Sequence, residues 1–412
     1  MLVRCKSWFW CEIALGMIIV LAVAADTRGG LRYNLGAPPK VTFDGTRRKD
    51  KRNYLARCYV SDQKLHDAVL AALGTVIEPE LGQDLVSLNM IRDLTVDEAG
   101  AVRFTVMLTT PACPLKDQIQ REAEQAVRGV EGVRSVEVKL DSNVPTDPRI
   151  FGRLNLPIRS IIAISSGKGG VGKSTVAVNL AVALAQSGSR VGLMDADILG
   201  PNIPKMLGLG FAQPKVSPER KLIPFEVFGL QVMSMGFLAD PNQAMIWRGA
   251  MLHGAIRQFF EDVAWGELDY MVVDLPPGTG DAQLSLAQSV PLTGAIIVTQ
   301  PQSVAVDDAR RGLAMFEKLN VPIIGVVENM AGPLFGEGGG EKFAEERGVP
   351  FLGRIPLVAS VREGGDVGRP VVAYAPESEV GQAFHKLVQQ IAARVSMLLL
   401  EEKPAIPLKI VK

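Results

Sequence analysis

The sequence predicts an α/β fold, a mostly parallel sheet with helices on both faces, preceded by a small α+β domain. A β-branched run at 159–166 breaks into a glycine-rich turn and then into the helix-forming series 175–186. Two further apolar strands each run into aspartates, and beyond residue 290 strands and helices alternate, as in sheets covered on both faces. These later elements are strand 294–299, helix 304–319 and strand 321–329.

The glycine-rich turn has the composition of a phosphate-binding loop, GKGGVGKST, placed between a buried strand and a helix. Glycines let the backbone fold its N–H groups around an anion, and the N-terminus of the following helix points at the same place. Lys173 can reach the β- and γ-phosphates, and the Ser174 hydroxyl can bind Mg²⁺, so we predict that the chain binds a nucleoside triphosphate. The predicted contacts in this loop are Gly167, Lys168, Gly169, Gly170, Val171, Gly172, Lys173, Ser174 and Thr175.

Three aspartates form a candidate catalytic and metal site: Asp195 and Asp197 follow one apolar strand, and Asp274 ends another. Ligands of open parallel sheets bind beyond the carboxyl ends of the strands, so these side chains are expected to converge on the phosphates. Asp274 is predicted to hold Mg²⁺ with Ser174, and Asp195 to support the metal. Asp197 is predicted to position and polarise the attacking water. The alternative is that all three are solvated turn residues.

Composition indicates an intracellular globular protein. The chain has 412 residues, 47% hydrophobic and 21% charged, which is ordinary usage and enough for two or three domains. Its 44 basic and 44 acidic residues balance, so nothing indicates a nucleic-acid surface. The four cysteines are far apart and form no C-x-x-C, which indicates a reducing compartment and predicts a cytoplasmic protein.

The small domain is predicted at 61–142, where apolar residues recur at helical spacing in 65–76 and 114–130. Segments 102–108 and 133–140 alternate between apolar and polar residues, as half-buried strands do. The expected organisation is a leader at 1–60, the α+β domain at 61–142, a Pro-, Asn- and Asp-rich linker at 143–158, the nucleotide-binding domain at 159–400 and a tail at 401–412.

The leader is unlike the rest of the chain. Arg4 and Lys6 precede an apolar stretch that is short for a membrane span, and residues 26–60 are basic and without periodicity. Three interpretations stay open: a disordered or untranslated leader ahead of a start near Val60, a membrane anchor, or a cleaved export signal. The last predicted helix, 384–400, has no basic face, so membrane contact through it is not expected.

Particular residues carry a family resemblance. The extra lysine of GKGGVGKST, Lys168, resembles the deviant phosphate loop of the ParA/MinD group, and the runs DADILGPNIPKMLG, VDLPPGTGD and GVVENM resemble the Mrp/ApbC iron–sulfur carrier ATPases. The resemblance implies a slow Mg-dependent ATPase that acts as a homodimer. It also implies that Lys168 reaches the partner's nucleotide and, with Lys173 and Asp197, carries catalysis, while Asn329 reads the adenine. The alternatives are a solvated loop lysine and a plain turn asparagine.

The runs TVIEPELGQDLVSLNMI and LTTPACPLKD resemble the small domain of iron–sulfur assembly proteins. Cys113 stands before a predicted helix, whose N-terminus is expected to lower the pKa of the thiol, although a buried apolar role is the alternative. The resemblance makes Cys113 a weak candidate cluster ligand. One departure matters: after ENM, where many Mrp-type proteins carry a C-x-x-C, residues 331–335 contain no cysteine, so the usual bridging cluster has no ligands there. Three alternatives stay open: Cys113 from two subunits contributes, the protein is an ATP-driven scaffold that helps another carrier, or it has lost cluster work.

Two functions remain for the sequence as a whole. The first is a dimeric ATPase that assembles, carries or transfers iron–sulfur clusters to apoproteins, or helps other assembly factors, with ATP and Mg²⁺ as cofactors and cluster binding uncertain. The second is an ATP-dependent positioning switch of the ParA/MinD kind, without a cluster. The small domain favours the first.

Overall fold

The computed structural model describes residues 64–97, 99–150, 156–197, 200–210, 212–237, 254, 257–278 and 280–401. The predictions for the leader, and for the tail from residue 402 onward, lie outside these ranges. Among the helices within them, none combines the length and apolar character that crossing a bilayer requires.

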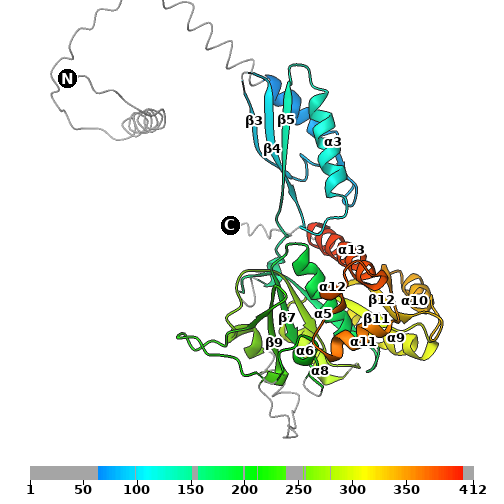
Figure 1. The fold of residues 1–412 in the computed structure, drawn as a ribbon. Coiled ribbons are helices and arrows are strands. Elements are labelled where there is room, and N and C mark those ends of the chain that lie inside the picture. Colours follow the sequence, from blue (N-terminus) through cyan, green and yellow to red (C-terminus); the bar gives the residue numbers. More distant parts are fainter. Residues whose placement is uncertain are drawn as a thin grey trace, which may run out of the picture. The chain divides into compact units, whose positions relative to one another are not determined.

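The larger domain is built on one sheet, which has eight strands in the described part of the chain (Figure 1). Neighbouring strands of this sheet are parallel, apart from the antiparallel pair at one edge, β8 (Phe225–Val227) with β9 (Leu230–Ser234). The predicted fold class is therefore confirmed. In spatial order the strands are β13 (Phe351–Pro356), β12 (Ile323–Ala331), β11 (Gly294–Thr299), β6 (Ile158–Ser166), β10 (Leu268–Asp274), β7 (Val191–Asp195), β9 (Leu230–Ser234) and β8 (Phe225–Val227).

Helices cover both faces of this sheet because successive residues of a strand point to opposite sides. On β6, Ile162 and Ile164 join one core, and Ile161 and Ala163 join the other. The first core is closed by α5 (Lys173–Gln186), α12 (Val371–Tyr374) and α13 (Glu379–Glu401), and the second by α9 (Ser303–Lys318) and α10 (Gly339–Arg347).

The helix that follows the phosphate loop, α5, is deeply buried. Every residue from Val176 to Leu184 lies in the interior, which agrees with a sequence that is apolar on all sides. Such a helix is fixed against the sheet along its length, so the loop at its N-terminus has a rigid support. The remaining short helices of this domain are α6 (Ile203–Met206), η1 (Met235–Phe237), α8 (Asp281–Ser289) and α11 (Ala359–Asp366), and residues of α6 and α11 lie beside the loop.

The smaller domain has a core of its own, formed by a helix at 64–73, the helix α3 (Lys116–Arg128) and a three-stranded sheet. In this sheet β4 (Ala101–Leu108) lies between β3 (Ile91–Val96) and β5 (Ser135–Ser142). Strands β3 and β4 are antiparallel, whereas β4 and β5 are parallel. Two very short strands, β1 and β2, form a separate hairpin. The bounds are β1 (Ile77–Glu78), β2 (Gln83–Asp84), β3 (Ile91–Val96), β4 (Ala101–Leu108), α3 (Lys116–Arg128) and β5 (Ser135–Ser142).

Candidate nucleotide-binding site

The loop between β6 and α5 has the backbone of an anion cradle. Gly170 and Gly172 adopt φ angles of +80° and +82°, the left-handed conformation that side chains disfavour. At Gly167 a Cβ atom would lie 2.0 Å from the carbonyl carbon of Asp308 in α9, so this position has no room for any side chain. The glycines therefore satisfy both a backbone and a packing requirement.

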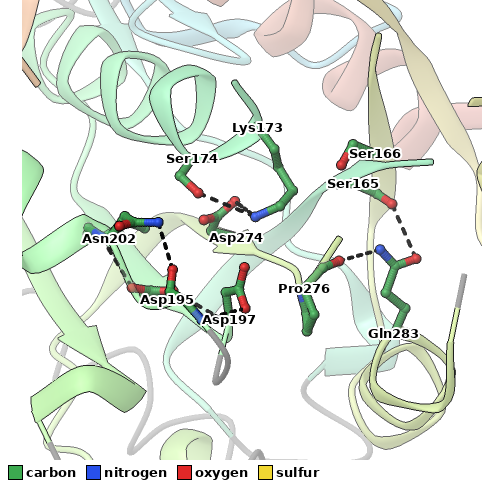
Figure 2. Close-up of polar contacts among 12 residues, drawn as sticks. Ser165, Ser166, Lys173, Ser174, Asp195, Asp197, Asn202, Asp274, Pro276 and Gln283 are labelled. Carbon is green, nitrogen blue, oxygen red and sulfur yellow. Dashed lines mark hydrogen bonds and ion pairs between the residues drawn. The ribbon is translucent and has the colours of Figure 1, made fainter. Parts of the chain in front are cut away.

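Lys173 and Asp274 form a buried ion pair at the centre of the site (Figure 2). The Lys173 Nζ donates to Asp274 Oδ1 at 2.7 Å and lies 3.4 Å from the Ser174 hydroxyl oxygen. Burial raises the pKa of the Asp274 carboxyl, and the Lys173 ammonium acts in the opposite direction. Three residues that the sequence predicted to act together are thus brought together.

The residues predicted to hold Mg²⁺ fit that ion. The second carboxylate oxygen of Asp274, Oδ2, is buried and has no hydrogen-bond partner, and the nearby Ser174 side chain acts to lower the pKa of this carboxyl. A carboxylate oxygen without a partner costs free energy unless a cation or water satisfies it. A hydroxyl and a carboxylate are the hard oxygen ligands that Mg²⁺ prefers. The donor set therefore suits the metal ion of a nucleotide.

Asp195 is fully buried and bonded to the protein through both oxygens. Its Oδ1 accepts from the backbone N–H of Asp197, and its Oδ2 accepts from the N–H of Ile203 and from the Ser234 hydroxyl at 2.9 Å. Burial raises the pKa of the Asp195 carboxyl to about 8, with Asp274 acting in the same direction and the bond from Ser234 lowering it. Asp195 therefore fixes the loop that carries Asp197 (Figure 2).

A cavity of about 410 Å³ opens at the phosphate loop. Asp197 lines it, whereas the deeper Asp195 and Asp274 do not, so Asp197 alone of the three aspartates reaches the cavity wall. The same cavity extends to α6 and α11. The predicted site residues that line it are Lys168, Gly169, Gly170, Gly172, Lys173, Ser174, Thr175, Asp197 and Asn329.

Asn329 also contacts the phosphate loop itself. It is buried at the end of β12, and its Nδ2 donates to the carbonyl oxygen of Val171 at 2.8 Å. A Cβ on Gly172 would lie 2.2 Å from that nitrogen. Asn329 therefore has a role in loop structure that its predicted contact with adenine did not include.

Two further side chains were missed by sequence reasoning. Ser234, at the end of β9, donates to Asp195. Gln283 in α8 accepts from the Ser165 hydroxyl and donates to the carbonyl of Pro276, which joins the loop after β10 to the end of β6 (Figure 2). The position of Ser234 at a strand end was the available signal, but its strand was not predicted.

The loop after β12, where the expected C-x-x-C is missing, is held by a buried carboxylate. Glu328 accepts from the backbone N–H groups of Gly338 at 2.9 Å and Gly340 at 2.6 Å, and from Arg354 Nε at 3.0 Å. At the tip of this loop, Leu334 is 75% exposed. The residues 331–340 thus form a fixed turn without thiolates.

Cys113 is buried, which agrees with the apolar alternative given for it. The side chain packs in the core of the smaller domain, and burial raises the pKa of its thiol to about 11, with Glu80 and Glu78 acting in the same direction. The expectation that this pKa is lowered is wrong, because the loss of solvation outweighs the backbone hydrogen bond at Leu115, while the role of Cys113 as a cluster ligand stays a prediction. Within the described residues, no group of three or more His, Cys, Asp and Glu side chains is arranged to hold a metal ion.

A glycine-rich loop between a central parallel strand and a buried helix, with a lysine and an aspartate paired beneath it, defines a P-loop nucleotide-binding protein. Comparison with known proteins makes the class more specific. A family model described as NUBPL iron-transfer P-loop NTPase, of the ParA type, matches residues 157–392, and one described as iron-sulfur cluster assembly protein matches residues 66–140. The chain belongs to the NUBPL iron-transfer P-loop NTPase family.

Named relatives are similar over most of the chain. An "Iron-sulfur cluster carrier protein" of Synechocystis sp. is 53% identical over 349 residues, which cover 81% of this chain and 99% of that protein. The protein of the same name in Escherichia coli K12 is 38% identical over 347 residues, 81% of this chain and 94% of that one. A solved nucleotide-binding protein from Archaeoglobus fulgidus in complex with ADP is 40% identical and covers 55% of this chain and 92% of its own, with a TM-score of 0.48.

Proposed function

We propose that this protein is an Mg²⁺-dependent ATPase that assembles, carries or transfers iron–sulfur clusters to apoproteins. The observation that carries the proposal is the Lys173–Asp274–Ser174 group under a preformed glycine-rich loop, in a chain whose relatives are named iron–sulfur cluster carriers. The match of residues 66–140 to cluster assembly proteins supports this function over a positioning switch without a cluster.

The phosphate chemistry follows from the charges in the cavity. Lys173 would leave Asp274 to contact the β- and γ-phosphates, and Ser174 and Asp274 would then hold Mg²⁺. When bound, that ion neutralises developing phosphate charge. Asp197, on the cavity wall, would orient the attacking water, and Asp195 would act on the metal region through the loop that it fixes. Hydrolysis is expected to be slow in a single copy.

In a homodimer, the second copy of the chain would supply a further positive charge at each nucleotide. Lys168 lines the cavity, and we propose that it reaches the nucleotide of a second copy, where a positive charge stabilises the transferred phosphoryl group. Asn329 would contact the adenine with the part of its amide that does not bond to Val171. Turnover would then depend on protein concentration, because two chains must meet for each active site to be complete.

The cluster is cargo in this proposal. A cluster is usually held by four thiolates, and Cys113 is the one cysteine among the described residues. The described part of one chain therefore does not supply a full set of cluster ligands. Apoproteins and other assembly factors are the proposed partners, in the cytoplasm. The proposed division of labour gives cluster or partner contact to residues 61–142 and ATP hydrolysis to residues 159–400, with 143–158 as the linker.

Two measurements on the full chain test the proposal. Calorimetry with Mg-ATP and Mg-ADP should detect binding, and an assay of phosphate release should detect hydrolysis that rises with protein concentration. Anaerobic reconstitution with iron and sulfide, followed by visible absorption and transfer to an apo-ferredoxin, should show a cluster whose transfer responds to ATP. Nucleotide binding with neither cluster absorption nor an effect on a target would leave an ATPase and contradict the carrier function.

A further inference from the structure

Three carbonyl groups of the phosphate loop are each held by a side chain. The Ser166 hydroxyl donates to the carbonyl of Lys168 at 2.9 Å, and Gln300 Nε2 donates to that of Gly170 at 3.3 Å. Asn329 Nδ2 donates to the carbonyl of Val171 at 2.8 Å. These donors come from the ends of the adjacent strands β6, β11 and β12, so the three side chains hold the loop from the sheet.

Each of these bonds also fixes an N–H group. A trans peptide unit is planar, and its C=O points opposite to the N–H of the next residue. The loop contains no cis peptide bond. Turning a carbonyl toward its side-chain donor therefore turns the following N–H away from that donor. The N–H groups fixed in this way belong to Gly169, Val171 and Gly172, which are within the loop that surrounds the expected phosphates.

We infer that Ser166, Gln300 and Asn329 are positioning residues that orient the N–H groups of Gly169, Val171 and Gly172 toward the phosphates of the nucleotide. The inference rests on the proposed ATP binding. An anion cradle gains affinity when its dipoles are oriented before the ligand arrives, because their ordering then costs nothing on binding. None of the three side chains needs to touch the nucleotide for this purpose.

The burial of the donors supports this role. Gln300 and Asn329 are 9% and 5% exposed, and Gln300 Nε2 also lies 2.9 Å from Met330 Sδ. Met330 itself has a φ of +60°, a conformation that costs free energy in a residue with a side chain. Met330 stands at an irregularity in the pairing of β12 with β13, directly after Asn329, so the backbone departs from regular strand geometry where the two amides meet the loop.

The test uses a ligand that has phosphates but no base. Calorimetry would compare Mg-tripolyphosphate with Mg-ATP for the full chain and for Ser166→Ala, Gln300→Met and Asn329→Leu. Ser166→Ala and Gln300→Met should bind both ligands about threefold to tenfold more weakly, by the same factor, as expected for one lost hydrogen bond. Asn329→Leu should weaken tripolyphosphate by a similar factor and ATP by more, because it also removes the proposed adenine contact. Gln288→Met, which changes an exposed amide on α8, is the matched control and should bind as the wild type does.

Amide resonances give a readout that general destabilisation would not move. In the wild type, tripolyphosphate should shift the N–H signals of Gly169, Val171 and Gly172. Ser166→Ala should reduce the shift at Gly169 alone, Gln300→Met that at Val171, and Asn329→Leu that at Gly172. Variants with wild-type affinity for both ligands would overturn the inference, as would an Asn329→Leu variant that loses ATP but keeps tripolyphosphate. A wild type that binds neither ligand would overturn the proposed function and this inference with it.

Discussion

Two glycine-rich loops follow parallel strands of the same sheet, and they use their backbones in opposite ways. The phosphate loop, residues 167–172, follows β6; three of its carbonyl groups are bonded to side chains, and most of its residues line a cavity. The loop at 332–340 follows β12, and the N–H groups of Gly338 and Gly340 are bonded to Glu328. Glycine content alone therefore does not make an anion site.

The charge beneath each loop agrees with this difference. A lysine, Lys173, begins the helix after the phosphate loop, where a cation can meet an anionic ligand. Under the second loop the carboxylate of Glu328 already occupies the place of an anion, and Arg354 balances it. The second loop also lacks the thiolates expected there in this family. The contacts of the second loop with Glu328 therefore indicate a structural role.

Replacing Lys173 should have the largest effect. Lys173→Ala removes the ammonium that contacts the phosphates and leaves Asp274 buried without its cation, so nucleotide binding and turnover should both be abolished. Calorimetry with Mg-ATP measures the binding. Lys342→Ala, at an exposed lysine of α10, is the matched control. A Lys173→Ala protein that melts cooperatively and still binds ATP with wild-type affinity would refute the assignment of this loop.

Replacing Lys168 should separate binding from turnover. Lys168→Ala keeps every contact within one chain, so Mg-ATP affinity should stay within about twofold. If Lys168 acts across the dimer as an arginine finger does, phosphate release should fall by about a thousandfold. Wild-type hydrolysis by this variant would show that the lysine does not act on the partner's nucleotide.

Replacing Glu328 should affect stability and leave the nucleotide alone. Glu328→Gln weakens bonds to two backbone N–H groups and breaks the ion pair with Arg354, so the free energy of unfolding should fall by about 2–3 kcal/mol. Denaturant unfolding without nucleotide measures the loss. Mg-ATP affinity should be unchanged, and a tenfold fall in it would mean that the second loop contributes to the site.

A matched pair of glycines should give the smallest and most specific effects. Gly172→Ala and Gly338→Ala both place a side chain at positive φ, +82° and +90°, which costs about 1–2 kcal/mol. At Gly172 the new Cβ also meets Asn329, whereas at Gly338 nothing lies within 4 Å. Calorimetry and thermal unfolding should therefore show weaker ATP binding for Gly172→Ala only. Equal affinities in the two variants would contradict the difference between the loops.

The features that could be predicted from the sequence are those set by residues close together in the chain. The strand, loop and helix at 159–186 are local in sequence, and their glycines and lysine carry the pattern. The expectation that Asp195, Asp197 and Asp274 converge on one ligand came from the rule that ligands bind at strand ends, and of the three only Asp197 lines the cavity. Lys173, Ser174 and Asp274 do lie together, while their catalytic roles and those of the other site residues stay predictions.

What could not be predicted depends on contacts between distant segments. Strands β9 and β13 were not predicted, and so neither was the contact from Ser234 to Asp195, which joins strands far apart in the chain. The bond from Gln283 to Pro276 depends on how α8 packs. Cys113 shows the same limit, since its pKa is set by the burial that the surrounding core imposes and not by the adjacent helix alone.

Amide hydrogen exchange with and without Mg-ATP tests the central difference most directly, because it reports on the N–H groups of both loops at once. Peptides that cover residues 167–174 should exchange freely in the nucleotide-free protein and become protected on binding. Peptides that cover residues 336–341 should be protected in both states, because Glu328 already binds their N–H groups. No change at the phosphate loop, or an equal gain of protection in both loops, would contradict the assignment.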